Sequence, residues 1–319
     1  MAVHVAIQPG FSIDLGGFKA MAESVYGGIQ AVGVEVTSDT GHVFPADLVS
    51  IPVPTNNTVV WLTDVTYAFT DPLQPIAPVI FKVELGVWRT NNNYFPARRV
   101  TIGTATDGAG AFVGVSHVAD CRTQMYTSPA WSTQDALAPS FYCHNHTAGF
   151  LGVVAGSGSG GHAAKTSSIL SFFIARTTDA AGVATADGFT LIVASDYKRP
   201  QEYGAAGQLN PYAAMHIDTT RGVSYESEEI SPRVGGPTPI ISGTDVVEPQ
   251  QCFVQTGAGI VPVYGLISLW SDYPTTGGEL ACANGSVFER NYVALGSELG
   301  AVVSKGTVYS AYQLAMLFE

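Results

Sequence analysis

The segment 149–168, GFLGVVAGSGSGGHAAKTSS, combines an apolar run, a glycine-rich stretch and a Lys-Thr pair, which are the residue types of a phosphate-binding loop. In such a loop the lysine directly follows the last glycine, because it must reach the phosphates from the first helical turn. Here three residues separate Gly161 from Lys165. Residues 167–177 are β-branched and aromatic, so they predict a strand where the loop needs a helix. The pattern therefore argues against an NTPase.

The segment 142–147, YCHNHT, is the strongest candidate for metal binding. On a strand, His144 and His146 would point the same way and Cys143 the opposite way. Two imidazoles so placed can bind one metal ion. The cupin arrangement would need a glutamate a few residues later, and TAGFLGVV contains none. Three copies of the pair around a threefold axis would supply six nitrogens for an octahedral site. The alternative to metal binding is an ordinary polar turn beside a buried cysteine.

Signatures of nucleophilic catalysis are missing from the sequence. The serines near Gly158 do not form the G-x-S-x-G pattern, and no local motif pairs a cysteine with a histidine. We therefore expect a protein that is not an enzyme and needs no cofactor. A glycoside hydrolase stays open as an alternative, since that chemistry needs two carboxylates at a set separation in space. The candidates are Asp218, Glu226, Glu228, Asp245 and Glu248.

The four cysteines, Cys121, Cys143, Cys252 and Cys282, fall into two pairs along the chain. The N-terminal residues show no secretory signal, so reduced thiols of a cytoplasmic protein are the first expectation. A particle that assembles in the cytoplasm and is then released could oxidise them, so disulfides among these four are the alternative.

Three aromatic residues stand at predicted loop edges: Trp131, Trp270 and Tyr273. Exposed aromatic rings at such positions anchor subunit contacts or stack on sugars. We expect them at an interface between subunits, with glycan binding as the alternative.

Short runs rich in Val, Ile, Thr, Tyr and Phe, bounded by turn residues, dominate the chain and predict strands. The clearest are 56–70, 78–90, 97–106, 111–118, 189–197, 260–270 and 301–318. One short helix is predicted over 18–29, ended by Gly27 and Gly28. The fold class is therefore mostly β, with tandem β-sandwich or barrel-like domains, long loops and one short N-terminal helix.

The expected organisation is an N-terminal β domain over 1–120, a second β domain over 121–246, and a C-terminal β segment over 247–319 that could belong to the second domain. Residues 200–239 have weak periodicity and many turn residues, so we expect a long irregular excursion there. The pattern T-D-x-x-G recurs at 106–110 and 178–182, and it predicts hairpin turns closed by the aspartate side chain.

Charged residues make up 13% of the chain, with 14 Lys and Arg against 26 Asp and Glu and a net charge of −12. A nucleic-acid-binding protein needs a basic face, and none is visible. No apolar run is long enough for a membrane span. Because interface cores are depleted in charge in the same way, we expect a subunit that buries much of its surface against other chains.

This combination resembles the proteins of tailed-bacteriophage particles: mostly β, poor in lysine, rich in Gly, Ala, Thr and Val, with hairpin turns such as TTDAAGVATADGF. The resemblance covers the whole chain and is to the broad class. It implies a neck, tail, baseplate, fibre-base or head-decoration subunit in the virion, assembled in the host cytoplasm. The implied partners are other copies of the chain and other virion proteins, with a glycan receptor as a further partner. A carbohydrate- or receptor-binding β-sandwich is the alternative.

Overall fold

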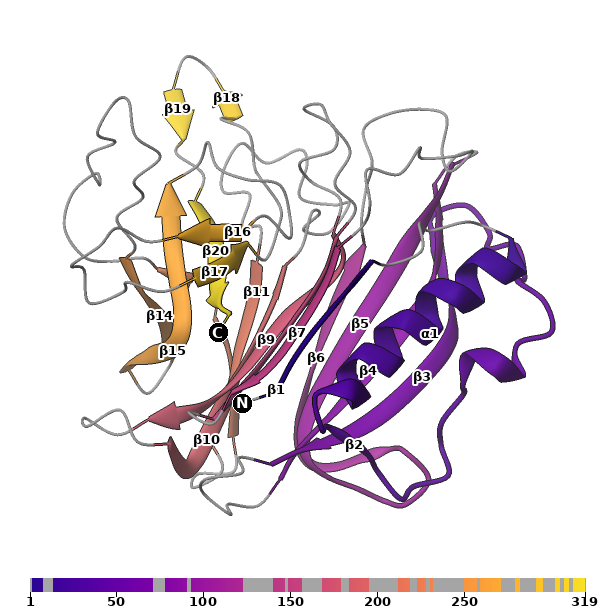
Figure 1. Cartoon of the computed structure of the whole chain (residues 1–319), viewed down its shortest axis with the longest axis horizontal. Helices are drawn as coiled ribbons and strands as arrows, with labels where there is room; N and C mark the ends of the chain where they lie inside the picture. Colours follow the sequence, from indigo (N-terminus) through magenta and orange to yellow (C-terminus); the bar gives the residue numbers. More distant parts are fainter. Residues whose placement is uncertain are drawn as a thin grey trace.

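Over the residues that it describes, the computed structural model shows mostly β structure with one α-helix, as the sequence predicts (Figure 1). The residues that the structure describes are 2–7, 14–70, 78–90, 93–122, 140–146, 149–156, 168–178, 184–194, 212–218, 223–227, 230–231, 250–256, 259–270, 279–281, 291–294, 302–304, 307–309 and 312–318. Their sheets are open and antiparallel, and they lie in three layers.

The first layer is a five-stranded sheet. Its strands, in spatial order, are β2 (Glu35–Val36), β3 (Thr58–Phe69), β4 (Val79–Thr90), β5 (Asn93–Thr106) and β6 (Phe112–Arg122). The first four predicted runs are confirmed as β3 to β6. The polar face of β4 carries two ion pairs, from Lys82 to Asp64 at 3.9 Å and from Glu84 to Arg99 at 3.8 Å.

The turn between β5 and β6 has the predicted hairpin chemistry. Asp107 Oδ1 accepts hydrogen bonds from the backbone N–H groups of Ala109 at 2.9 Å and Ala111 at 3.1 Å. Gly108 and Gly110 have φ values of 82° and 85°, which glycine adopts without strain. The second predicted turn, at 178–182, lies largely outside the described residues, although the strands that flank it pair antiparallel.

The central layer is a seven-stranded sheet. Its strands, in spatial order, are β1 (Ala2–Ile7), β7 (Ser140–His146), β8 (Phe150–Gly156), β9 (Ser168–Thr178), β10 (Ala184–Ala194), β11 (Tyr212–Asp218) and β12 (Val223–Ser227). Strand β9 confirms that a strand, and not a helix, follows the Lys-Thr pair. Strand β10 confirms the run predicted at 189–197, with an earlier start.

The third layer is a six-stranded sheet. Its strands, in spatial order, are β13 (Ile230–Ser231), β14 (Gln250–Thr256), β15 (Gly259–Trp270), β20 (Tyr312–Leu317), β17 (Asn291–Ala294) and β16 (Glu279–Ala281). A separate hairpin joins β18 (Val302–Ser304) to β19 (Thr307–Tyr309). The run predicted at 301–318 is therefore three short strands.

The expectation that 200–239 is irregular throughout is corrected by the structure. Strands β11, β12 and β13 all lie within this segment, and β11 pairs along its whole length with β10. Sequence periodicity is weak here because the three strands are short, so none of them gives a window long enough to show alternation. The predicted domain boundaries at 120/121 and 246/247 stay predictions.

The helix α1 (Leu15–Ala31) is longer than predicted and passes through Gly27 and Gly28. Asp14 caps its first turn, since Asp14 Oδ1 accepts a hydrogen bond from the Gly17 N–H at 2.8 Å. Gly28 does not end the helix: it lets the helix approach β7, because a Cβ at this position would come 2.1 Å from the Phe141 ring. At the end of the helix it is Gly33, two residues beyond Ala31, that has a positive φ, of 82°.

One core joins the helix and the first two sheets. The Tyr26 hydroxyl of α1 hydrogen-bonds with Thr63 Oγ1 of β3 at 2.8 Å and donates to the Val83 carbonyl of β4 at 3.3 Å. Between the sheets, the rings of Phe81 on β4 and Phe172 on β9 lie 5.8 Å apart. The two sheets therefore pack face to face as a sandwich, with α1 in the same core.

Candidate functional site

Strand β7 carries the histidine pair that the sequence singles out. His144 and His146 are both buried, and their ring centroids lie 5.2 Å apart. Cys143 lies on the opposite face of β7, in the core that includes α1 and the five-stranded sheet. The predicted alternation is therefore confirmed: the histidines face the third layer and the cysteine faces the sandwich core.

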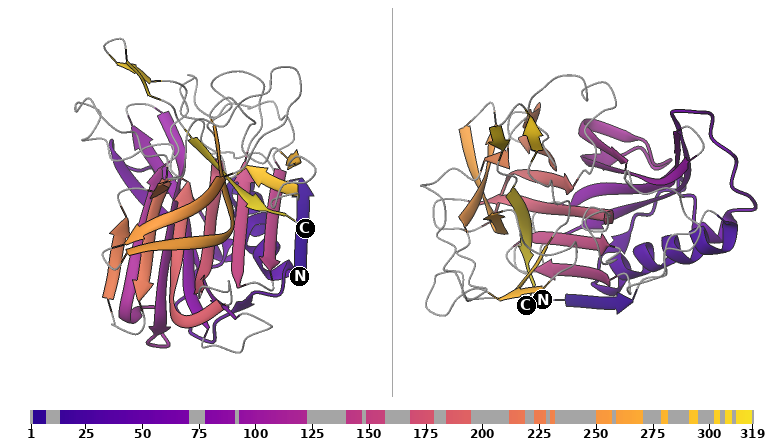
Figure 2. Two further views of the ribbon diagram at one scale, coloured as in Figure 1. Left: turned by 90° about the vertical axis from the view of Figure 1, so that its left-hand side faces the viewer. Right: turned by 90° about the horizontal axis from the view of Figure 1, so that it is seen from above.

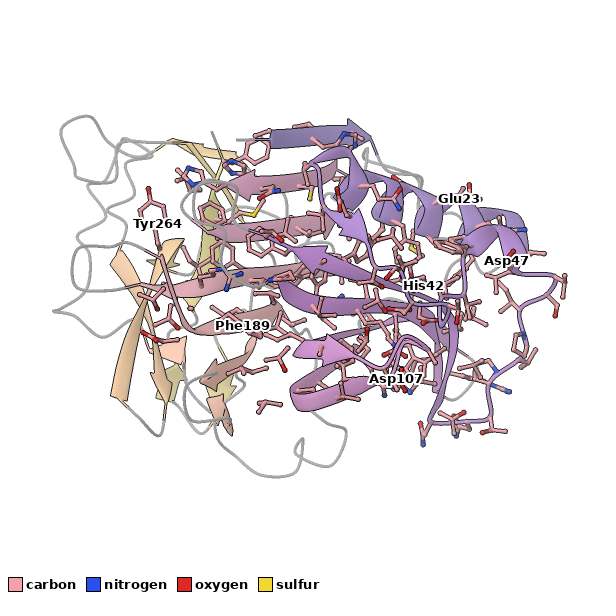
Figure 3. The ribbon with its side chains drawn as sticks, turned by 90° about the horizontal axis from the view of Figure 1, so that it is seen from below. Glu23, His42, Asp47, Asp107, Phe189 and Tyr264 are labelled. Carbon is pink, nitrogen blue, oxygen red and sulfur yellow. The ribbon has the colours of Figure 1, made fainter. Side chains whose placement is uncertain are left out.

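The histidine pair lies where the central sheet packs against the six-stranded sheet. His146 stacks on Phe150 of β8, with centroids 4.7 Å apart and an interplanar angle of 5°. Tyr264 of β15 lies 5.9 Å from the His146 ring, and Figure 3 shows it where these two sheets meet. Phe318 follows β20 and lies 5.8 Å from the His144 ring. The surroundings of the pair are aromatic.

The hydrogen bond of His144 fixes its tautomer. Its Nδ1 lies 2.9 Å from the Leu317 carbonyl oxygen of β20, and a carbonyl oxygen can only accept, so Nδ1–H is the donor. Metal-bound histidines are held in this way, with the other nitrogen as ligand. Within the described part of the chain, however, no group of three His, Cys, Asp or Glu side chains gathers to hold a metal ion. Metal binding by His144 and His146 stays a prediction.

A segment that sequence reasoning missed displays apolar side chains to solvent. We call residues 43–53, which connect β2 to β3, the apolar arm. Val49 and Val53 are 89% and 66% exposed, and Val43 and Phe44 are each 40% exposed. Leu48 and the neighbouring Ile51 point the other way and pack against the core. The arm thus has side chains that anchor it to the core and others, among them these valines, that are exposed to solvent.

Hydrogen bonds with residues of other elements hold the backbone of the apolar arm in place. Lys19 Nζ of α1 donates to the carbonyl oxygens of Ala46 and Leu48, both at 3.0 Å. At its start, the Val43 N–H donates to the Asp64 carbonyl oxygen at 2.9 Å. Just beyond its end, Arg89 Nη1 donates to the Pro54 carbonyl oxygen at 3.2 Å. Figure 3 shows Asp47, in the middle of the arm, at the margin of the molecule.

A second uncovered apolar element is β1, the first strand in the order of the central sheet. It pairs with β7 on one side, and Figure 2 shows it at the margin of that sheet. Val3 and Val5 are 43% and 55% exposed, whereas His4 and Ala6 are half-buried. The strand carries no charged residue and no proline, the features by which edge strands usually avoid pairing with other chains.

Comparison of the chain with protein-family models, curated proteins and solved structures found no match. Among the described residues, no helix is long and apolar enough to cross a membrane.

A buried polar cluster near the end of β2 was also missed at the sequence level. Asp39 Oδ1 lies 3.2 Å from His42 Nε2, and Asp39 Oδ2 accepts a hydrogen bond from the Thr37 hydroxyl. His42 Nδ1 accepts a hydrogen bond from the Thr66 N–H of β3 at 3.2 Å. The only sequence signal for it is an aspartate three residues before a histidine in a turn-rich segment.

The geometry of this cluster is that of a structural turn. A catalytic triad needs one imidazole nitrogen for the carboxylate and the other for the nucleophile. Here Thr37 Oγ1 and Asp39 Oδ1 both approach Nε2 of His42, and the backbone N–H of Thr66 donates to its Nδ1. The adjacent Thr40 N–H donates to the Gly108 carbonyl oxygen at 3.0 Å. The segment after β2 is therefore held against the β5–β6 turn.

Three of the four cysteines lie in the described part of the structure. Cys143 is a free, fully buried thiol, and burial raises its pKa far above the ordinary value. In the structure Cys143 forms no disulfide, and the redox state of the four cysteines stays a prediction. Cys121 and Cys252 lie on β6 and β14, while Cys282 lies outside the described residues. Disulfides among these three stay a prediction.

The other predicted site residues are not brought together by the described part of the structure. Trp131 and Tyr273 lie outside it, and Trp270 is the last residue of β15. Of the five candidate carboxylates for glycoside hydrolysis, Asp218 and Glu226 lie on the neighbouring strands β11 and β12. The other three lie outside the described residues. The roles of the aromatic residues at an interface and of the carboxylates in glycoside hydrolysis stay predictions.

Proposed function

We propose that this chain is a structural subunit of a tailed-bacteriophage particle, such as a neck, tail, baseplate, fibre-base or head-decoration protein. It acts by binding other copies of itself and other particle proteins, and it catalyses no reaction. The observation that carries the proposal is the apolar arm: an ordered segment, held by α1 and β4, that turns Val49 and Val53 toward solvent. Apolar surface displayed in this way is typical of protein–protein interaction sites.

The anchoring of the arm explains how it would bind. A loop that orders only on binding loses conformational entropy, which weakens the association. Lys19 and Arg89 already hold the arm backbone in the free subunit, so burial of its valines against a partner stabilises the complex with little ordering cost. Each valine side chain that becomes fully buried contributes about 1.5–3 kcal/mol.

The charge balance supports the same function. The chain has only 14 basic residues among 319. A surface this poor in charge loses little hydration energy when it is buried against neighbouring subunits. Both ring nitrogens of the buried His42 side chain are engaged by neighbouring groups, which supports a structural role for the cluster of Thr37, Asp39 and His42.

The proposal is tested by sedimentation velocity on the wild-type protein and two variants over a concentration series. Val49→Asp replaces an exposed valine of the arm, and Ser50→Asp adds the same charge at the next exposed position and removes no apolar surface. We expect the wild type to associate and Val49→Asp to raise the dissociation constant about tenfold, the equivalent of 1.4 kcal/mol. Equal weakening by both variants, or no association of the wild type, contradicts the proposal.

A further inference from the structure

Strand β1 is an edge that is ready to accept another strand. One side of its backbone pairs with β7 from Ala2 to Ile7, and its other side has no strand beside it among the described elements. The unpaired N–H and C=O groups of such an edge form a template for strand addition. The exposed valines, Val3 and Val5, show that the outer face of the strand is uncovered as well.

The charge around β1 indicates which partner it takes. The strand has no charged residue, and α1, which packs beside it, has one lysine and one glutamate, Lys19 and Glu23. This surface is therefore neutral on a chain whose net charge is −12. Two identical chains of this net charge meet with least repulsion where neither carries charge, which favours a second copy of this chain as the partner.

We propose that β1 pairs antiparallel with β1 of a second copy about a twofold axis, which joins the two central sheets into one. The twofold axis must stand perpendicular to the sheet, because only then do the strands run antiparallel with the same faces on the same side. This inference rests on the proposed function, since it names the partner and the contact through which one step of assembly occurs.

Symmetry restricts the register of the pairing. In an antiparallel pair, opposite residues lie on the same face, so the exposed odd-numbered residues of one copy must oppose odd-numbered residues of the other. Every register centred on a residue satisfies this condition, and the two that pair the greatest length of β1 are centred on His4 and on Val5. The register centred on His4 places Val3 opposite Val5 of the second copy twice, so both exposed valines of each copy are covered. This is the register that the inference assigns.

Cysteine cross-linking tests both the contact and its register. Val3→Cys and Val5→Cys are made separately in the full chain, and each is incubated with mild oxidant alone and as a mixture of the two. Glu35→Cys, an exposed position on the edge strand β2, is the control for random collision, and the wild type controls for the native cysteines. Light scattering on the same unoxidised samples reports whether they associate.

We expect a disulfide-linked dimer in the mixture of Val3→Cys and Val5→Cys, formed about 100-fold faster than with Glu35→Cys. Thiols held opposite each other reach an effective concentration of about 1 mM, against about 10 µM for free chains. A dimer that forms faster with Val5→Cys alone overturns the assigned register. Association by light scattering without this cross-link overturns the β1 contact and leaves the proposed function standing. Monomers at every concentration overturn both.

Discussion

Gly28 of α1 lies against the ring of Phe141 on β7, so closely that a Cβ on Gly28 would come 2.1 Å from the ring. A Cβ on Gly27, one residue earlier, would have no neighbouring atom within 4 Å. The contact explains why Gly28 stands within a helix, where glycine lowers stability, and leaves Gly27 unexplained. One of them is required by the contact between the helix and the central sheet, and the other is not.

Substitution of these two glycines should therefore change stability in opposite directions. Gly27→Ala should raise the free energy of unfolding by about 0.5–1 kcal/mol, because alanine is the better helix former. Gly28→Ala should lower it by about 1–3 kcal/mol, because the Phe141 ring and the helix must move apart. Urea denaturation of both variants and the wild type measures the two changes. Equal effects of the two substitutions would show that α1 does not pack closely on β7.

A second glycine tests the joint between the central sheet and the six-stranded sheet. A Cβ on Gly152 of β8 would lie 2.2 Å from the Met316 sulfur of β20. Methionine is flexible, so Gly152→Ala should cost only about 1 kcal/mol. The loss should be local, with faster hydrogen exchange at the amides of β15 and β20 and unchanged exchange in β3 and β4. Unchanged exchange in β20 would refute this packing.

Asp64 should give the stability a defined pH dependence. Burial raises the pKa of this carboxyl, and Lys82 and the Val43 N–H offset the rise in part. The folded protein therefore binds the proton more tightly than the unfolded chain, so stability falls as pH rises from the ordinary carboxyl value near 3.8 through the folded value. Asp64→Asn should remove this loss, and Lys82→Met should increase it.

Urea denaturation at a series of pH values measures the effect. The difference in unfolding free energy between Asp64→Asn and the wild type should grow in favour of the variant as pH rises. A difference that is constant with pH would mean that folding does not shift the pKa of this carboxyl, and one that shrinks would mean that the folded state stabilises its ionised form.

Cys143 should be chemically inert in the folded protein. Its thiol is fully buried, and burial raises its pKa, so the reactive thiolate is scarce at neutral pH. A variant that keeps Cys143 and replaces Cys121, Cys252 and Cys282 with serine isolates this thiol. Mass spectrometry after iodoacetamide treatment should show no adduct under native conditions and one adduct in urea. Rapid native alkylation would contradict the buried placement.

The local pattern of the sequence predicts much of the β structure, since the alternation of polar and apolar residues is a property of each strand alone. Strands β3 to β6 and β9 follow from it, and so does the common face of His144 and His146. The end of α1 was predicted wrongly because Gly28 serves a contact with Phe141, which lies more than 100 residues away in the chain. Such a contact leaves no local pattern.

The apolar arm and the β1 edge could not be read from the sequence for a different reason. A valine in a sequence indicates burial, and its exposure depends on which neighbours the fold supplies. Leu48 and Val49 are adjacent and equally apolar, yet the first packs on the core and the second is exposed. The cluster of Asp39 and His42 depends likewise on the Thr66 N–H of another strand.

The most direct test of the central claim is the mass of the purified protein in solution, measured by light scattering across a concentration series. We predict a defined oligomer that dissociates on dilution, since the apolar arm and the β1 edge are both open in the single chain. A protein that stays a 33.4 kDa monomer at every concentration would contradict self-assembly through these surfaces.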